Sequence, residues 1–192
     1  MLSCQHLIKS MLYSAMVLIA SFIFISCGDK PEYVTTELST AQVKPINLTK
    51  ETDKQFLVRA VEMKYAQALL GKLAQQRTSS EEIRTLAKML EDANREEKSA
   101  LASLAIIKSI QVPSAPTQSA HAAYDSLNVA TVEEFDFSYV RSAIQGYNDM
   151  IAHFENGTRT EMDPDIKAKA LAMIPVMRTH LSKAMEVDAH IN

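Results

Sequence analysis

Four stretches of this 192-residue chain repeat apolar residues at the spacing of an α-helix, and this repetition constrains the fold more than any other feature. At 100° per residue, each stretch places its apolar side chains on one face of a helix. The chain has only four glycines and no tryptophan, and it is rich in residues that favour helices. We therefore predict an all-α domain over residues 51–192.

Capping boxes predict where three of the helices begin, because the side chain of each partner can satisfy the other's free backbone N–H. The three pairs are Thr52 with Gln55, Ser79 with Glu82, and Thr131 with Glu134. We expect the first helix to end near Arg77. The second should run until Val112 and Pro113, where proline stops it. The third should end at Asn156 and Gly157, since glycine tolerates the left-handed conformation of a C-cap.

The fourth helix is expected to open with Asp163 as N-cap and Pro164 at its first position. Pro175 lies inside it and predicts a kink rather than a break, because the apolar stripe continues in phase on both sides. A shorter helix is expected over residues 117–127. Short connections within each pair of long helices predict an antiparallel four-helix bundle, with the short helix crossing over between the two hairpins.

Core residues follow from the same periodicity. On the third helix the expected core face is Phe137, Val140, Ile144, Tyr147, Ile151 and Phe154. On the fourth helix, Met173, Met177 and Met185 form a methionine run. Thioethers could bind copper, but methionine as an apolar filler of the core is the interpretation we favour.

The N-terminal stretch indicates where in the cell the protein is located. Its apolar run, Met11 to Ile25, is about fifteen residues long, which is shorter than the roughly twenty that cross a bilayer as a helix. Following Lys9, such a run is typical of a secretory signal. The residues Phe24, Ile25, Ser26 and Cys27 resemble the lipobox of bacterial lipoproteins. A cleaved soluble protein and a signal anchor are the alternatives.

The lipobox resemblance implies that residues 1–26 are a signal peptide and that Cys27 carries the lipid which binds the protein to a membrane. The location it implies is the bacterial cell envelope, as an outer-membrane lipoprotein facing the periplasm or the surface. Residues 27–50 contain two prolines and many Ser and Thr, and they predict a flexible tether. Because Cys4 would leave with the signal, the remaining Cys27 could form no internal disulfide.

Charge excludes one class of partner. The net charge of −3 is small and the two signs are mixed along the chain, so no basic face for nucleic acid is expected. The sequence specifies no protein partner and no cofactor.

Four segments together are similar to a known family. They are AVEMKYAQALLGKLA from Ala60, LAKMLEDANREEKSALASLA from Leu86, FDFSYVRSAIQGYNDMIAHFE from Phe135, and DPDIKAKALAMIPVMRTHL from Asp163. Over about residues 52–188 they resemble domain-of-unknown-function family 4142, exported bacterial helical proteins with a ferritin-like fold. The resemblance implies a fold and an envelope location, because the family has no settled activity.

The chain departs from the family at polar positions. The family carries an Asp-His pair in its second helix and another in its third, which read Asp92-Ala93 and Gly146-Tyr147 here, and an acidic position in its first helix is Gln67. Asp92 and His180 match the family. Metal or redox chemistry therefore does not follow from the resemblance.

The sequence also lacks the ligand motif of a di-iron site. A di-iron carboxylate site in a helical bundle uses Glu-x-x-His motifs, and none occurs, since Gln118, Met150, Met177 and Val187 stand three residues before the histidines 121, 153, 180 and 190. The polar residues within or beside the apolar stripes are Gln67, Asn94, Glu97, Tyr147, Asn148 and His180. We expect them to bond to one another or to lie at stripe edges near water.

These residues leave three functional hypotheses. The favoured one is a lipid-anchored, non-catalytic structural or binding module. The alternative is a metal-binding or peroxide-handling protein, with Glu97, His180 and a third ligand as the metal site and Tyr147 nearby. A carrier of an apolar ligand between the helices is a third class, which would require an internal cavity.

Overall fold

The computed structural model describes residues 46–191, and the predicted signal peptide, Cys27 and most of the tether lie outside them. The described chain forms five helices and no strand, so the all-α prediction is confirmed. The helices are α2 (Ile46–Arg77), α3 (Glu81–Ile107), α4 (Gln118–Asn128), α5 (Val132–Arg159) and α6 (Pro164–Ile191). None of the helices in this part of the chain is long and apolar enough to span a membrane.

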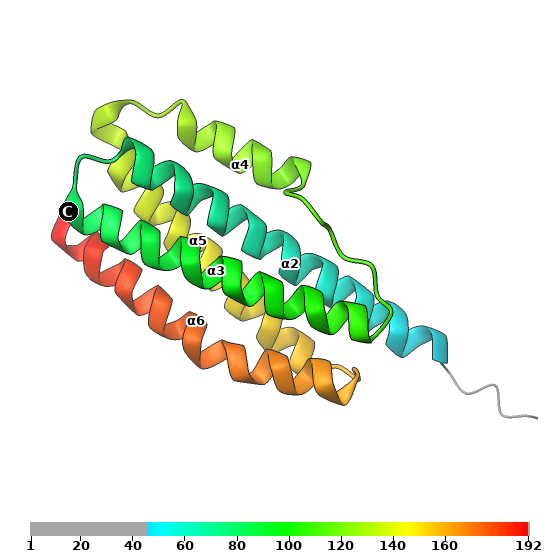
Figure 1. Cartoon of the computed structure of the whole chain (residues 1–192). Coiled ribbons are helices and arrows are strands. Elements are labelled where there is room, and N and C mark those ends of the chain that lie inside the picture. The colour runs from blue at the N-terminus through cyan, green and yellow to red at the C-terminus, as the bar shows by residue number, and fades with distance from the viewer. Residues whose placement is uncertain (1–45, 192) are drawn as a thin grey trace, which may run out of the picture. The chain divides into compact units, whose positions relative to one another are not determined.

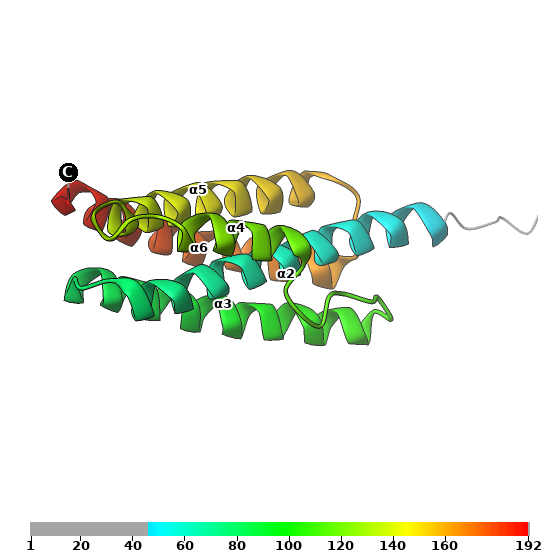
Figure 2. The same ribbon diagram turned by 90° about the horizontal axis from the view of Figure 1, so that it is seen from above.

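The four long helices lie side by side in two pairs (Figures 1 and 2). Residues 78–80 join α2 to α3 and residues 160–163 join α5 to α6, so each pair is an antiparallel hairpin. The short helix α4 packs chiefly on α2, outside the layer that α2 forms with α3. The predicted crossover helix therefore exists, and it leads from the first hairpin to the second.

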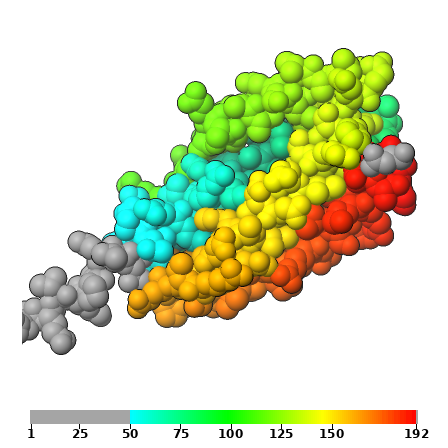
Figure 3. All heavy atoms as spheres, turned by 180° about the vertical axis from the view of Figure 1, so that it is seen from behind, coloured from blue at the N-terminus to red at the C-terminus, as the bar shows by residue number. Residues whose placement is uncertain are grey.

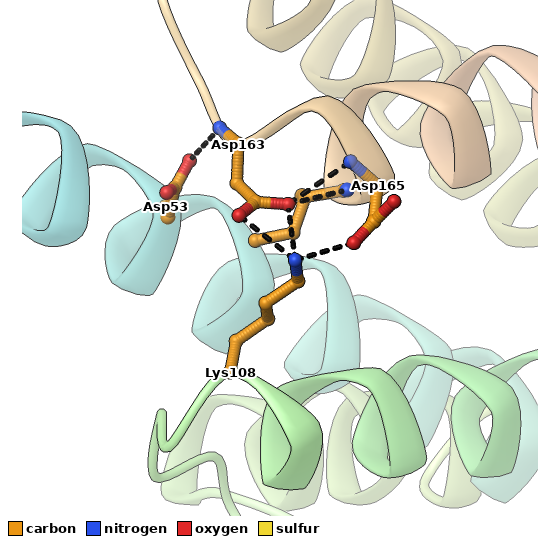
Figure 4. A network of polar contacts seen from close by, with 5 residues as sticks. Asp53, Lys108, Asp163 and Asp165 are labelled. Atoms are coloured by element: carbon orange, nitrogen blue, oxygen red, sulfur yellow. Dashed lines mark hydrogen bonds and ion pairs between the residues drawn. The ribbon is translucent and has the colours of Figure 1, made fainter.

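A network of polar contacts connects three of the helices at one end of the described domain (Figure 4). Lys108, which caps the C-terminus of α3, places its Nζ 2.8 Å from Asp163 Oδ1 and 2.5 Å from Asp165 Oδ2. The backbone N–H of Asp163 donates a hydrogen bond to Asp53 Oδ1 on α2 (3.0 Å). Residues from α2, α3 and the start of α6 are thereby tied together.

Several predicted helix limits are confirmed. Thr131 is the N-cap of α5, and its Oγ1 accepts the N–H of Glu134. Asp163 Oδ1 accepts the backbone N–H groups of Asp165 and Ile166, which caps α6. The helix α6 continues through Pro175 without a break.

The start of the first two helices was predicted wrongly. The helix α2 begins at Ile46 rather than Thr52, so the last residues of the predicted tether are helical. No proline or glycine lies between Ile46 and Thr52 to stop the helix there. The cap of α3 is Ser80 rather than Ser79, and Ser80 Oγ accepts the N–H of Ile83 (3.3 Å).

The helix α3 ends at Ile107, before the predicted stop at Val112. Ser109 has a left-handed backbone, with φ of 55°. The N–H of Ile110 reaches the carbonyl of Ala105, and that of Ser109 reaches Ile106, which is the hydrogen-bond pattern of a Schellman motif. The buried side chains of Ile110 and Ala105 supply its hydrophobic contact.

The helix α5 passes through Gly157 and ends at Arg159, which corrects the predicted end at Asn156 and Gly157. A Cβ on Gly157 would lie 2.7 Å from two ring atoms of Phe56, so this glycine allows close packing and is not a terminator.

The core of α5 also differs from the prediction. Phe137 is 39% exposed, and its ring packs under the guanidinium of Arg141, 4.4 Å away. Phe135, Tyr139 and Met150 are buried instead. On α6, Met173 and Met177 are buried in the core as predicted, whereas Met185 is exposed.

Candidate functional site

A lysine lies in the middle of the helical core. Lys64 on α2 has no solvent-exposed surface, and its Nζ is 2.5 Å from Glu97 Oε2 on α3, whose side chain is 12% exposed. The same Nζ lies 5.8 Å from the ring centre of Tyr147 and 5.9 Å from that of Phe154. The lysine ammonium is therefore held by one carboxylate and two aromatic faces.

Burial lowers the pKa of Lys64, while the negative charge of Glu97 and its hydrogen bond act in the opposite direction. A charge removed from water is costly unless a partner compensates it. Glu97 is the acidic partner that the structure gives Lys64.

A second polar group lies beside this pair. Asn94 on α3 donates from Nδ2 to the hydroxyl oxygen of Tyr147 on α5 (2.8 Å) and to the carbonyl of Leu90 (2.7 Å). The hydroxyl of Tyr147 lies 3.3 Å from Nδ1 of His180 on α6. The hydroxyl accepts from Asn94, and it can donate its own proton to His180 Nδ1 when the histidine proton is on Nε2.

The pKa values in this group keep it neutral. Burial lowers the pKa of His180, and the nearby charges of Glu97 and Lys64 act in opposite directions. Burial also raises the pKa of Tyr147 well above its usual range, with the charge of Glu97 adding to the effect. Asn94 Oδ1 is buried and has no hydrogen-bond partner in the described chain.

The structure brings some of the predicted polar residues together and separates others. Asn94, Tyr147 and His180 form one hydrogen-bonded group, as we expected for stripe residues that satisfy each other. Glu97 bonds to Lys64, while Asn148 is exposed. Gln67 lies elsewhere, against Gly146.

Lys64 was missed by the sequence reasoning. A signal for it existed, because Ala60, Lys64 and Gln67 follow one another at helical spacing on one face of α2. A lysine is seldom fully buried unless it is paired, so this spacing alone does not predict its burial.

The donor set does not fit a metal ion. Among the described residues, no three histidine, cysteine or acidic side chains are grouped so that they could hold one. The carboxylate of Glu97 already bonds to an ammonium, whose charge would repel a cation. His180 Nδ1 faces a tyrosine hydroxyl rather than a second ligand.

Comparison with known proteins identifies a family and a fold. No curated protein matches the sequence. A crystal structure of a DUF305 fragment from Deinococcus radiodurans has a similar helical fold, with a TM-score of 0.63 and 16% identity, over 72% of this chain and 96% of that one. At this identity the likeness shows the fold alone. The family model described as Domain of unknown function (DUF4142) matches residues 37–187, and the chain belongs to this family.

Proposed function

We propose that the protein is a lipid-anchored, non-catalytic helical module of the bacterial cell envelope, built as an antiparallel four-helix bundle of the ferritin-like type. The observation that carries the proposal is the Lys64–Glu97 pair in the core. In ferritin-like metal proteins, inward carboxylates from several helices converge on the metals. In this chain the inward carboxylate of Glu97 holds a lysine ammonium.

The rest of the interior supports a structural role. The hydroxyl of Tyr147 is hydrogen-bonded on both sides, by Asn94 and by His180. Its raised pKa prevents it from acting as a base near neutral pH. The ammonium of Lys64, which lies beside these residues, has no exposed surface through which a substrate could reach it.

Metal binding or peroxide handling remains the competing hypothesis, and the donor geometry does not favour it. Glu97 and His180 would have to turn toward a common point, and Lys64 would have to leave the space between the helices. Metal analysis tests this directly. The full chain, purified in detergent without chelators or a metal-binding tag, should contain far less than one equivalent of any transition metal.

The matched variants are Glu97→Gln and Glu96→Gln, because Glu96 is the exposed neighbour of Glu97 on α3. Near-stoichiometric metal that is lost in the first variant and kept in the second would overturn the non-catalytic proposal. Equal and negligible metal in all three proteins would support it.

Membrane attachment is supported by the sequence Phe24 to Cys27 that follows the apolar run. Metabolic labelling with an alkyne fatty acid in a bacterial host should label the full chain, and Cys27→Ser should abolish the label. We expect the labelled protein in the outer-membrane fraction, with the bundle in the periplasm or at the surface. A wild-type chain that is exported without label would refute lipid anchoring.

A further inference from the structure

A hollow of about 900 Å³ lies between α4 and α5, with α2 beneath it. Figure 3 shows it as a depression between the lime α4 and the yellow α5. A smaller hollow of about 240 Å³ adjoins it toward the start of α4. Gln67 and Gly146 line both hollows, so the two meet where α2 and α5 approach each other.

Gln67 of α2 supplies a polar side chain to the base of both hollows. The residue is only 7% exposed. The carboxamide lies against Gly146, where a Cβ would stand 1.9 Å from Nε2. Because Gln67 lines the hollow, its carboxamide is available to a ligand there, whose direct hydrogen bonds would replace those to water.

The walls of the hollow offer neutral hydrogen-bonding groups. Ser126 from α4 and Ser138 and Ser142 from α5 line it, and each hydroxyl can donate one hydrogen bond and accept others. Leu70 and Ile144 supply apolar surface between them. Such a mixture suits a ligand with many hydroxyl groups and a partly apolar skeleton.

The charged groups at the rim are already engaged within the protein. Arg141 Nε lies 4.0 Å from Asp188 Oδ1, and Gln145 donates to Asp149 Oδ1 (2.8 Å). Arg59 lies 3.8 Å from Glu62 at the smaller hollow. Arg141 and Arg59 are each paired with an acidic side chain, whereas Asp149 accepts from the neutral amide of Gln145 and adds a negative charge to the rim. The groove therefore disfavours an anionic ligand.

We propose that this groove binds a neutral saccharide that carries hydroxyl and N-acetyl groups. The carboxamide of Gln67 exchanges two hydrogen bonds with one N-acetyl amide, and the serine hydroxyls bond to ring hydroxyls. The inference deepens the proposed function, since it names a ligand class for the module. It depends neither on the Lys64–Glu97 pair nor on lipidation of Cys27.

The test is a titration of the ¹⁵N-labelled full chain with the tetramer of N-acetylglucosamine, in a detergent without a sugar head group. The side-chain amide signals of Gln67 and the backbone amides of residues 138–146 should shift together and saturate at millimolar ligand. Gln67→Met keeps the length and burial of the side chain without the carboxamide, and it should weaken binding by about tenfold. Gln76→Met, an exposed position on the same helix, should bind as the wild type does.

Gly146→Ala provides a second variant. The new Cβ meets the far end of a flexible side chain, so the helices can stay in place while the Gln67 carboxamide is displaced. We expect this variant to lose binding while its helical signal and melting transition are retained. Absence of shifts in the wild type, or binding by Gln67→Met equal to that of the wild type, would overturn the proposal. Either result would leave the metal and labelling tests of the proposed function intact.

Discussion

Removing one partner of the buried Lys64–Glu97 pair should destabilise the protein by an amount that depends on which partner remains. In Glu97→Gln, an ammonium with no exposed surface loses its carboxylate. Breaking a buried ion pair in this way costs about 3–5 kcal/mol. In Lys64→Met, the methionine fills nearly the same volume against Tyr147 and Phe154. The carboxylate left behind is 12% exposed and reaches water, so the cost should be about 1–3 kcal/mol.

The double variant Lys64→Met with Glu97→Gln removes both charges from the core. Replacing a buried pair by neutral groups of similar shape is often neutral or stabilising. We therefore expect the double variant to be at least as stable as Lys64→Met alone. The coupling free energy between the two positions should then be at least as large as the cost of Glu97→Gln, about 3–5 kcal/mol. Urea unfolding followed by helical circular dichroism measures all four proteins, and Glu96→Gln serves as the exposed control.

The pH dependence provides an independent check on this reasoning. Burial holds the pKa of Lys64 below its ordinary 10.5 in the folded state, against the opposing charge of Glu97. Between the lowered folded pKa and 10.5 the unfolded chain binds more protons, so stability rises with pH across that window. Loss of the opposing charge in Glu97→Gln lowers the folded pKa further, and the rise should begin at a lower pH. A Glu97→Gln variant that is less destabilised than Lys64→Met, or additive effects in the double variant, would refute the argument.

Four further predictions concern stability. Ser109→Gly should stabilise the protein by about 1 kcal/mol, because it relieves a left-handed backbone at φ 55°; a loss of stability in urea unfolding would contradict this. Gly157→Ala should cost about 1–3 kcal/mol, since the new Cβ meets the ring of Phe56 at 2.7 Å; an unchanged unfolding midpoint would show that the ring moves aside. Tyr139→Phe should be neutral or stabilising by up to about 1 kcal/mol, because the buried hydroxyl has no hydrogen-bond partner in the described chain; a clear destabilisation would reveal a missing partner. Burial lowers the pKa of His153 in the folded state, although its hydrogen bond to the Phe56 carbonyl acts in the opposite direction. The free energy of unfolding should therefore fall as the pH drops from 6.5 toward that lower pKa. His153→Gln should flatten this part of the plot of unfolding free energy against pH.

The local signals of the sequence predicted the helices better than their ends. Thr131 and Asp163 were predicted as caps because cap chemistry is local, and the structure confirms both. Ser109 gave no signal, since its left-handed backbone is held by the Schellman bonds and by burial of Ile110. Gly157 gave a misleading signal, because its role depends on Phe56, about a hundred residues earlier in the chain.

The candidate site was predictable only in part, because some of its contacts join residues that are far apart in the chain. Asn94 and Tyr147 stood out as polar residues within apolar stripes, and they do meet. The partner of Glu97 could not be identified, because a lysine at the edge of a stripe has the pattern of a solvent-facing residue. The side of α2 that faces the core depends on how the second hairpin packs on the first. This packing joins residues far apart in the chain, so the local sequence around Lys64 does not reveal it.

In the described chain, Lys64 and Lys108 form ion pairs between helices, and this is consistent with a scaffold. Lys64 joins α2 to α3 in the core, and Lys108 joins the end of α3 to the start of α6. An ammonium attached to the chain provides the positive charge that such carboxylates need, but unlike a metal ion it cannot dissociate, exchange or accept a substrate as an additional ligand. The hydrogen bonds to Asp163 and Asp165 raise the pKa of Lys108, so this link remains charged across the physiological range. A helical module that fills these positions with its own cations gains cross-links that do not depend on a supply of metal.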